Sequence, residues 1–306
     1  MQNEYALSRY EQAADLLPVR WRQAARRLSM EKKTVAEEFR LRTGQPMTVL
    51  LPEGEMPLSE KDSRQAVTQS DIEQLCDTVT EYSRYAASDT LSQGFITARG
   101  GFRIGLCGTA VVREGKNSNL KEFSSAAIRI AREKQGIALP LLPLLWEEGE
   151  FCSTLILSAP GRGKTTLLRD MVRLLSDGTE EFPFLRISLV DERGELAAMH
   201  EGVAQLDVGQ HTDILEACPK AQAIPMLLRC MNPQIVAVDE ITVKEDLRAM
   251  ASAANCGVQL LATAHAANKE ELFAKPLFRE LVELGVFKRY ITIAIEAGER
   301  RYIVEP

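Results

Sequence analysis

Apolar and polar residues follow different patterns in the two halves of the chain. In the second half, short apolar runs typical of buried parallel strands alternate with segments of helical spacing. Strands are predicted over residues 154–157, 184–190, 235–238 and 258–263, and helices over 167–175, 213–231, 244–255 and 269–284. This alternation favours an α/β fold, in which helices pack on a parallel sheet. The chain is expected to end in a hairpin over residues 287–295 and 301–304, joined by 296–299.

The first half of the chain predicts a smaller α+β domain. Residues 1–30 indicate one or two helices, and a further helix is expected to have Ser70 or Asp71 as its N-cap and to run to about Tyr85. Strands are predicted over residues 36–42, 47–51, 94–97, 102–112 and 126–131. Pro140 and Pro143 mark a linker. We therefore expect an N-terminal domain over residues 1–137 and a second domain over residues 138–306.

A glycine-rich turn follows the first predicted strand of the second domain. It consists of Ser158, Ala159, Pro160, Gly161, Arg162, Gly163, Lys164, Thr165 and Thr166. Strand, glycine-rich turn, Lys-Thr and helix form the context of a phosphate-binding loop, where backbone N–H groups and the helix dipole attract phosphates. Lys164 can reach the β- and γ-phosphates of a nucleotide, and the Thr165 hydroxyl can hold Mg²⁺. Ser158 stands where the full motif has glycine, so we expect the loop to form at some conformational cost.

Polar residues also end the other predicted strands. Asp239 and Glu240 directly follow the strand over 235–238, whose carboxyl end should lie beside the phosphate-binding loop. There Asp239 can orient Mg²⁺ through its waters and Glu240 can polarise an attacking water, although two surface acids at a strand end would look the same. Glu192 follows another strand and is a weaker signal. His265 follows the strand over 258–263 and is either a γ-phosphate sensor or a structural histidine.

Composition and charge narrow the function classes. The 306 residues carry a net charge of −6, which does not favour binding to nucleic acid or to anionic lipid. Residues 1–17 do not resemble a signal peptide, and the longest apolar run, 137–146, is too short to span a bilayer. Six cysteines without zinc spacing indicate free thiols in a reducing cytosol. Residues 18–28 hold four arginines, which fit either a membrane or partner surface or a solvated helix face.

With these residues assembled, the chain resembles the secretion-type RecA-like ATPases of type II and type IV secretion and pilus retraction. Residues 191–195 occupy the place of that family's acidic box, without its proline, and residues 262–268 are similar to its histidine box. Residues 101–104 and 128–130 resemble the segments that bring arginines to the nucleotide. The resemblance covers roughly residues 35–265.

This resemblance implies an α/β fold with a RecA-like P-loop ATPase domain and a smaller α+β N-terminal domain. It also implies ATP and Mg²⁺ as ligands and a homo-hexamer in which a neighbouring subunit completes the site. Glu240 would activate water, with Glu192 as the alternative, and His265 would sense the γ-phosphate. Arg103 and Arg129 are the candidates for the completing arginine.

Several segments are most similar to a sporulation branch of that superfamily. They lie at residues 190–193, 207–209, 212–215, 218–221 and 238–241. The similarity implies an ATPase of the mother-cell cytoplasm, peripheral at the forespore outer membrane. It would power a membrane-embedded secretion or channel complex, and no nucleic-acid partner is expected.

Two other functions stay open at this point. A RecA-like motor or binder of single-stranded nucleic acid would share the core, but the net charge of −6 and the lack of a basic stretch interleaved with aromatic residues disfavour it. A nucleotide-binding scaffold with little turnover would carry the same motifs.

Overall fold

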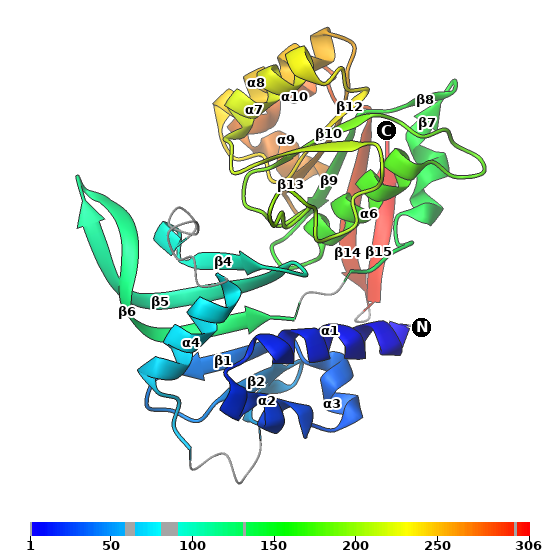
Figure 1. The fold of residues 1–306 in the computed structure, drawn as a ribbon. Helices are drawn as coiled ribbons and strands as arrows, with labels where there is room; N and C mark the ends of the chain where they lie inside the picture. Colours follow the sequence, from blue (N-terminus) through cyan, green and yellow to red (C-terminus); the bar gives the residue numbers. More distant parts are fainter. Residues whose placement is uncertain (1, 59–64, 81–90, 131–132, 297–298) are drawn as a thin grey trace. The chain divides into compact units, whose positions relative to one another are not determined.

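The computed structural model describes residues 2–58, 65–80, 91–130, 133–296 and 299–306 (Figure 1). The chain divides into two compact units. The first unit comprises Met1–Arg132 and Ala198–Gln205, and the second comprises Glu133–Ala197 and Leu206–Pro306. The second unit is thus interrupted by a short excursion of the chain. In that excursion the Gln205 side chain accepts a hydrogen bond from the Gly100 N–H at 2.7 Å.

The first unit is an antiparallel sheet with helices. Its elements are α1 (Gln2–Leu16), α2 (Val19–Arg26), α3 (Met30–Val35), β1 (Glu38–Arg42), β2 (Thr48–Leu51), β3 (Gly54–Pro57), α4 (Gln69–Val79), β4 (Phe95–Ala98), β5 (Phe102–Arg113) and β6 (Lys116–Arg129). The strand order is β3-β2-β1-β6-β5-β4, and every neighbouring pair is antiparallel. This is the α+β arrangement that the first half of the sequence predicts.

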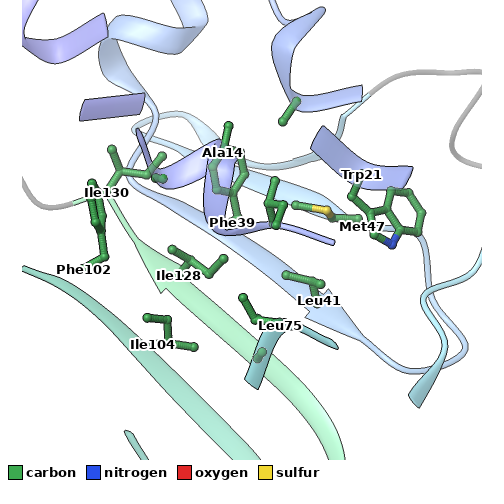
Figure 2. Close-up of a cluster of buried hydrophobic side chains, with 14 of the residues drawn as sticks. Ala14, Trp21, Phe39, Leu41, Met47, Leu75, Phe102, Ile104, Ile128 and Ile130 are labelled. Atoms are coloured by element: carbon green, nitrogen blue, oxygen red, sulfur yellow. The ribbon is translucent and has the colours of Figure 1, made fainter. Parts of the chain in front are cut away.

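The core of the first unit lies between one face of this sheet and the helices. Residues of β1 are alternately buried and half-buried, as in a sheet with one covered face. The buried residues include Phe39 from β1, Ile104 from β5 and Ile128 from β6, together with Trp21 from α2 (Figure 2). The Tyr10 hydroxyl, buried in the same cluster, donates a hydrogen bond to the Ala25 carbonyl at 2.8 Å.

Some predicted elements of the first unit have other boundaries. Helices α1 and α2 agree with the one or two helices predicted over residues 1–30, but a third helix that was not predicted, α3, follows before the sheet. Strand β6 begins at Lys116, ten residues before the predicted strand. The N-cap of α4 is Thr68, not Ser70 or Asp71. Thr68 Oγ1 accepts the Asp71 N–H at 3.3 Å, and the Asp71 carboxylate accepts the Thr68 N–H at 2.6 Å. The predicted continuation of α4 beyond residue 80 and the end of the strand predicted over 126–131 lie outside the described residues.

The second unit is a mostly parallel sheet with helices. Its elements are a 3₁₀ helix (Leu139–Leu145), β7 (Trp146–Glu147), β8 (Glu150–Phe151), β9 (Thr154–Ser158), α6 (Lys164–Asp177), β10 (Ile187–Asp191), β11 (Thr212–Glu216), α7 (Lys220–Cys230), β12 (Ile235–Val238), α8 (Lys244–Asn255), β13 (Gln259–His265), α9 (Lys269–Ala274), α10 (Pro276–Glu283), β14 (Arg289–Glu296) and β15 (Glu299–Glu305). The main sheet has the order β11-β10-β12-β13-β9-β14-β15. Only the β14–β15 pair is antiparallel, which confirms the predicted α/β fold class.

Helices cover both faces of this sheet (Figure 1). Helices α7, α8 and α10 pack on one face, where they bury alternate residues of β9, β12 and β13. Helix α6 packs against β9, β10 and β13. All residues of β9, β10 and β12 are buried, as expected for central strands covered on both sides.

Two predictions for the second unit are wrong. Residues 212–216 form the edge strand β11, paired in parallel with β10, rather than the start of a helix. The helix predicted over 269–284 is two helices, because Pro276 lacks an N–H and begins α10. Pro140 and Pro143 lie inside a 3₁₀ helix. Within the described part of the chain, no helix has the length and apolar character needed to span a membrane, and no two cysteines form a disulfide.

Candidate nucleotide site

The glycine-rich turn connects the buried strand β9 to helix α6. Gly161 has a φ of 73° and Gly163 a φ of 98°, backbone conformations that glycine adopts more readily than other residues. Gly163 is the N-cap of α6, so the free N–H groups of the first helical turn begin directly after it. Residues 159–162, which include Ala159, Pro160 and Arg162, are exposed. The turn therefore presents its backbone and a helix N-terminus to a phosphate group.

Ser158 adopts an ordinary backbone conformation, since it is not among the residues with positive φ. The predicted conformational cost of a serine at this position is therefore wrong. Ser158 is fully buried, and its hydroxyl donates a hydrogen bond to the Ala159 carbonyl at 2.8 Å. Its own carbonyl oxygen accepts a hydrogen bond from Lys164 Nζ at 3.0 Å.

Lys164 connects the turn to the neighbouring strand β13. Its ammonium lies 2.8 Å from His265 Nδ1 and 3.3 Å from the Ala159 carbonyl oxygen. An ammonium only donates, so His265 Nδ1 accepts and the ring proton is on Nε2. Burial lowers the pKa of Lys164, while the nearby carboxylates of Asp239 and Glu240 oppose this shift.

Two threonine hydroxyls position Asp239 at the end of β12. Thr165 Oγ1 donates to one carboxylate oxygen of Asp239 at 3.0 Å, and Thr263 Oγ1 donates to the other at 2.6 Å. Mg²⁺ in phosphate-binding sites usually takes only one or two protein oxygens, with phosphate and water completing its shell. Thr165 and Asp239 fit this donor set. Among the described residues, no group of three or more His, Cys, Asp or Glu side chains has the arrangement of an all-protein metal site.

Glu240 lies between a histidine and an arginine. One carboxylate oxygen is 2.7 Å from His265 Nε2, and the other accepts a hydrogen bond from Arg193 Nη1 at 2.6 Å. The Glu240 backbone has a φ of 39°, and its N–H donates to Thr263 Oγ1 at 2.8 Å. This left-handed conformation is uncommon for a residue other than glycine.

The two acids at the end of β10, its last residue Asp191 and the following Glu192, have different surroundings. The Asp191 carboxylate accepts the N–H groups of Glu195, Leu196 and Ala197 at 2.9, 3.0 and 2.8 Å, so it organises the following loop. Glu192 is ion-paired with Lys220, which is buried at the start of α7. These groups line a hollow of about 240 Å³ together with the two acids that follow β12; its lining is Asp191, Glu192, Arg193, Lys220, Asp239 and Glu240. The carboxyl edge of the sheet therefore gathers Glu192, Asp239 and Glu240, as the sequence predicts.

The two predicted arginines belong to the first unit and have partners there. Arg129 Nε lies 3.3 Å from the Glu38 carboxylate, and the Arg103 guanidinium lies over the Phe95 ring, 3.9 Å from its centroid. Their contribution to a nucleotide site stays a prediction. Thr166 lies in the first turn of α6 and is half-buried.

Sequence reasoning missed three residues of this site. Thr263 binds both Asp239 and Glu240, Arg193 binds Glu240, and Lys220 binds Glu192. Thr263 and Arg193 lie inside segments that resemble the histidine and acidic boxes, so they could have been nominated by position. Lys220 lies in the segment 218–221 that is similar to the sporulation branch, but its pairing with Glu192 depends on where α7 begins, which the segment itself does not specify.

Comparison with known proteins identifies the family. The family model described as "Sporulation stage III, protein AA" matches residues 7–303. The chain belongs to this family. Stage III sporulation protein AA of Bacillus subtilis (strain 168) is 35% identical over 285 residues, which cover 93% of this chain and 91% of that protein. The predicted sporulation branch is confirmed.

Solved structures of secretion-type ATPases share the fold of this family member. The pilus retraction motor PilT with bound ADP aligns with a TM-score of 0.59 and 19% identity, over 88% of this chain and 78% of that one. The ATPase DotB from Legionella pneumophila aligns with a TM-score of 0.56 and 15% identity, over 88% and 76% of the two chains. The predicted RecA-like fold with an N-terminal domain is therefore confirmed.

Proposed function

We propose that this protein is a Mg²⁺-dependent ATPase in which Glu240 activates the attacking water. The observation that carries the proposal is the hydrogen-bonded series from Lys164 through His265 to Glu240, beside a glycine-rich helix N-terminus. It joins a phosphate-binding cation to a carboxylate through one imidazole. The pairing of Thr165 with Asp239 supports a magnesium site next to it.

Each residue has a distinct role in this proposal. The N–H groups at the start of α6 and the Lys164 ammonium bind the phosphates, and Thr165 and Asp239 would hold the metal ion. Mg²⁺, when bound, supplies neutralisation of the phosphate charge. Glu240 accepts a proton from water, and His265 and Thr263 fix the position of its carboxylate and backbone. Glu192 is the second candidate for the base, although its carboxylate is already ion-paired with Lys220.

We further propose that the ATPase acts as a homo-hexamer that powers a membrane-embedded secretion or channel complex in sporulation. Membership in a sporulation family and the fold shared with a pilus retraction motor support this proposal. The protein would work in the mother-cell cytoplasm, at the forespore outer membrane. Arg129, with Arg103 as the alternative, would complete the site of a neighbouring subunit. The net charge of −6 gives no support for nucleic acid as a partner.

The test compares Glu240→Gln with wild type in two assays, phosphate release from Mg²⁺-ATP and equilibrium nucleotide binding. The amide is nearly isosteric, so binding should be kept while turnover falls by about 10²–10⁴-fold. Glu245→Gln, an exposed glutamate in the first turn of α8, is the matched control. Turnover near that of wild type in Glu240→Gln would show that the base is elsewhere. The native mass with and without Mg²⁺-ATP tests the hexamer.

A further inference from the structure

The terminal hairpin reaches the phosphate-binding loop on the side away from His265. In the sheet order, β13 lies on one side of β9, and β14 followed by β15 lies on the other. Thr292 of β14 pairs with Leu157 of β9. Strand β14 then continues to Glu296, whereas β9 ends at Ser158. The hairpin therefore extends past the end of β9, at the edge from which the loop leaves.

Arg300, near the start of β15, contacts this loop. Its guanidinium carbon, Nη2 and Nε lie 3.4, 3.5 and 3.6 Å from the point that a Cβ atom on Gly163 would occupy. The three distances are nearly equal, so the guanidinium plane lies across Gly163 with its face toward the backbone. Gly163 directly precedes Lys164 and caps α6. The glycine thus serves both the left-handed backbone and the close approach of Arg300.

No described side chain compensates the charge of Arg300. Arg300 is exposed, and within the described residues it has no ion pair or side-chain hydrogen bond. The next residue differs, because Arg301 pairs with Glu296 at 2.9 Å. On the other side of the loop, Arg193 and Lys220 are also paired with carboxylates. Arg300 is therefore a cation at the loop whose donors remain available.

We propose that Arg300 binds the phosphates that ATP and ADP have in common, in the same subunit as the loop. This inference rests on the proposed nucleotide site. A guanidinium can donate two parallel hydrogen bonds to phosphate oxygens and keeps its charge at any physiological pH. The groups assigned to water activation, Glu240 and His265, lie on the β12–β13 side of the loop, whereas Arg300 lies on the β14–β15 side. Arg300 thus acts in binding rather than in cleavage.

The test measures ADP and ATP binding to Arg300→Gln in the full chain, with Arg301→Gln as the matched control. Losing one hydrogen bond between a charged group and the nucleotide lowers the binding affinity about tenfold. We expect that loss for both nucleotides in Arg300→Gln and an unchanged affinity in Arg301→Gln. In steady-state hydrolysis, Arg300→Gln should raise KM and leave kcat unchanged. Arg300→Lys should lie between the two, because it keeps the charge and loses the fork.

Other results would overturn the inference in recognisable ways. ADP affinity in Arg300→Gln equal to that of wild type would remove Arg300 from the site. A loss restricted to ATP would assign it to the γ-phosphate and contradict the shared-phosphate role. Arg300 would have a structural role if two results came together. Nucleotide-free Arg300→Gln would have a lower melting temperature than wild type, and Arg300→Lys, with the stability of wild type, would bind nucleotide with normal affinity. If wild type itself binds neither nucleotide, the proposed nucleotide site fails first.

Discussion

Charged side chains are used differently in the two units. On the sheet of the first unit they pair across strands at the surface, as Arg42 does with Glu55 and Arg129 with Glu38. At the carboxyl edge of the second unit's sheet, charged side chains gather beyond the strand ends, around the buried Lys164 and a hollow of about 240 Å³. Exposed pairs contribute little to stability. The grouped charges are costly to bury, and this difference indicates that chemistry, not stability, accounts for them.

The position of Lys164 illustrates this cost. Burial lowers its pKa, which means that the folded chain holds the proton less tightly than the unfolded chain does. A protonated Lys164 therefore reduces stability at neutral pH, and this cost disappears as the pH rises toward the ordinary pKa of lysine. A polyphosphate would stabilise the same charge. The predictions below test whether each charged group acts as an exposed ion pair, like those on the first unit, or as part of the nucleotide site.

Lys164→Ala should have the largest effect, an almost complete loss of nucleotide binding and turnover. Lys164 is the described cation that donates to the Ser158 carbonyl oxygen and to the His265 ring, where it can reach the β- and γ-phosphates. Binding of a fluorescent ATP analogue checks this, and the control is Lys244→Ala, an exposed lysine at the start of α8. Unchanged ATP affinity in Lys164→Ala would mean that the loop is an ordinary turn and that the charges of the second unit do not form a nucleotide site.

Arg129→Ala tests whether a charged residue of the first unit also acts in the reaction. As an arginine finger, Arg129 would contribute roughly 10³–10⁵ in rate, so turnover should fall by that order while binding to the isolated subunit is kept. Specific activity of wild type should also rise with protein concentration, because a neighbour completes the site. Both are read from phosphate release across a dilution series.

The matched control for Arg129 is Arg40→Ala. Arg40 pairs with the same carboxylate, Glu38, at 2.6 Å, so both variants disturb that carboxylate. Equal losses in the two variants would mean that Arg129 acts only through Glu38. Flat specific activity in wild type, with no deficit in Arg129→Ala, would mean that each subunit works alone.

Thr263→Val should give a smaller effect, about 10–100-fold on turnover, because Thr263 holds groups that act and does not itself react. Its hydroxyl binds the Asp239 carboxylate and the Glu240 N–H. Thr292→Val is the matched control, since Thr292 Oγ1 is buried in the same sheet without a hydrogen-bond partner. The Mg²⁺ concentration that gives half-maximal turnover should rise in Thr263→Val and stay unchanged in Thr292→Val. Identical kinetics in the two variants would show that the Thr263 hydroxyl does not support the site.

Much of this site could be predicted from local sequence. The strand over 235–238 and the helix over 244–255 have the predicted boundaries, because continuous apolar runs and helical spacing depend on nearby residues. Parallel pairing then places the strand-end residues Asp239 and His265 near the loop. β11 was mistaken for helix because an edge strand is only partly buried and lacks a continuous apolar run. Thr263 and Arg300 act through cross-strand register, which no local pattern specifies.

Glu55→Gln should give the smallest effect, and only on stability. The Glu55 carboxylate accepts hydrogen bonds from Arg42 and Thr48, and these contacts, the Arg42 hydrogen bond foremost, lower its pKa from 4.5 to about 2. A lowered carboxyl pKa means that the contribution is complete above pH 4.5 and is lost as the pH falls to about 2. The pair is exposed, so we expect Glu55→Gln to lower the free energy of unfolding by only about 0.5 kcal/mol at pH 7.

Urea unfolding of the full chain in a Trp146→Phe background reports on the first unit through Trp21, the other of the two tryptophans. The difference in unfolding free energy between Glu55→Gln and its parent should shrink between pH 4.5 and 2. Glu53→Gln, in the preceding turn, is the matched control. A pH-independent difference would mean that Glu55 stabilises the hairpin by packing, and an effect of Glu55→Gln on turnover would place a surface pair among the functional charges.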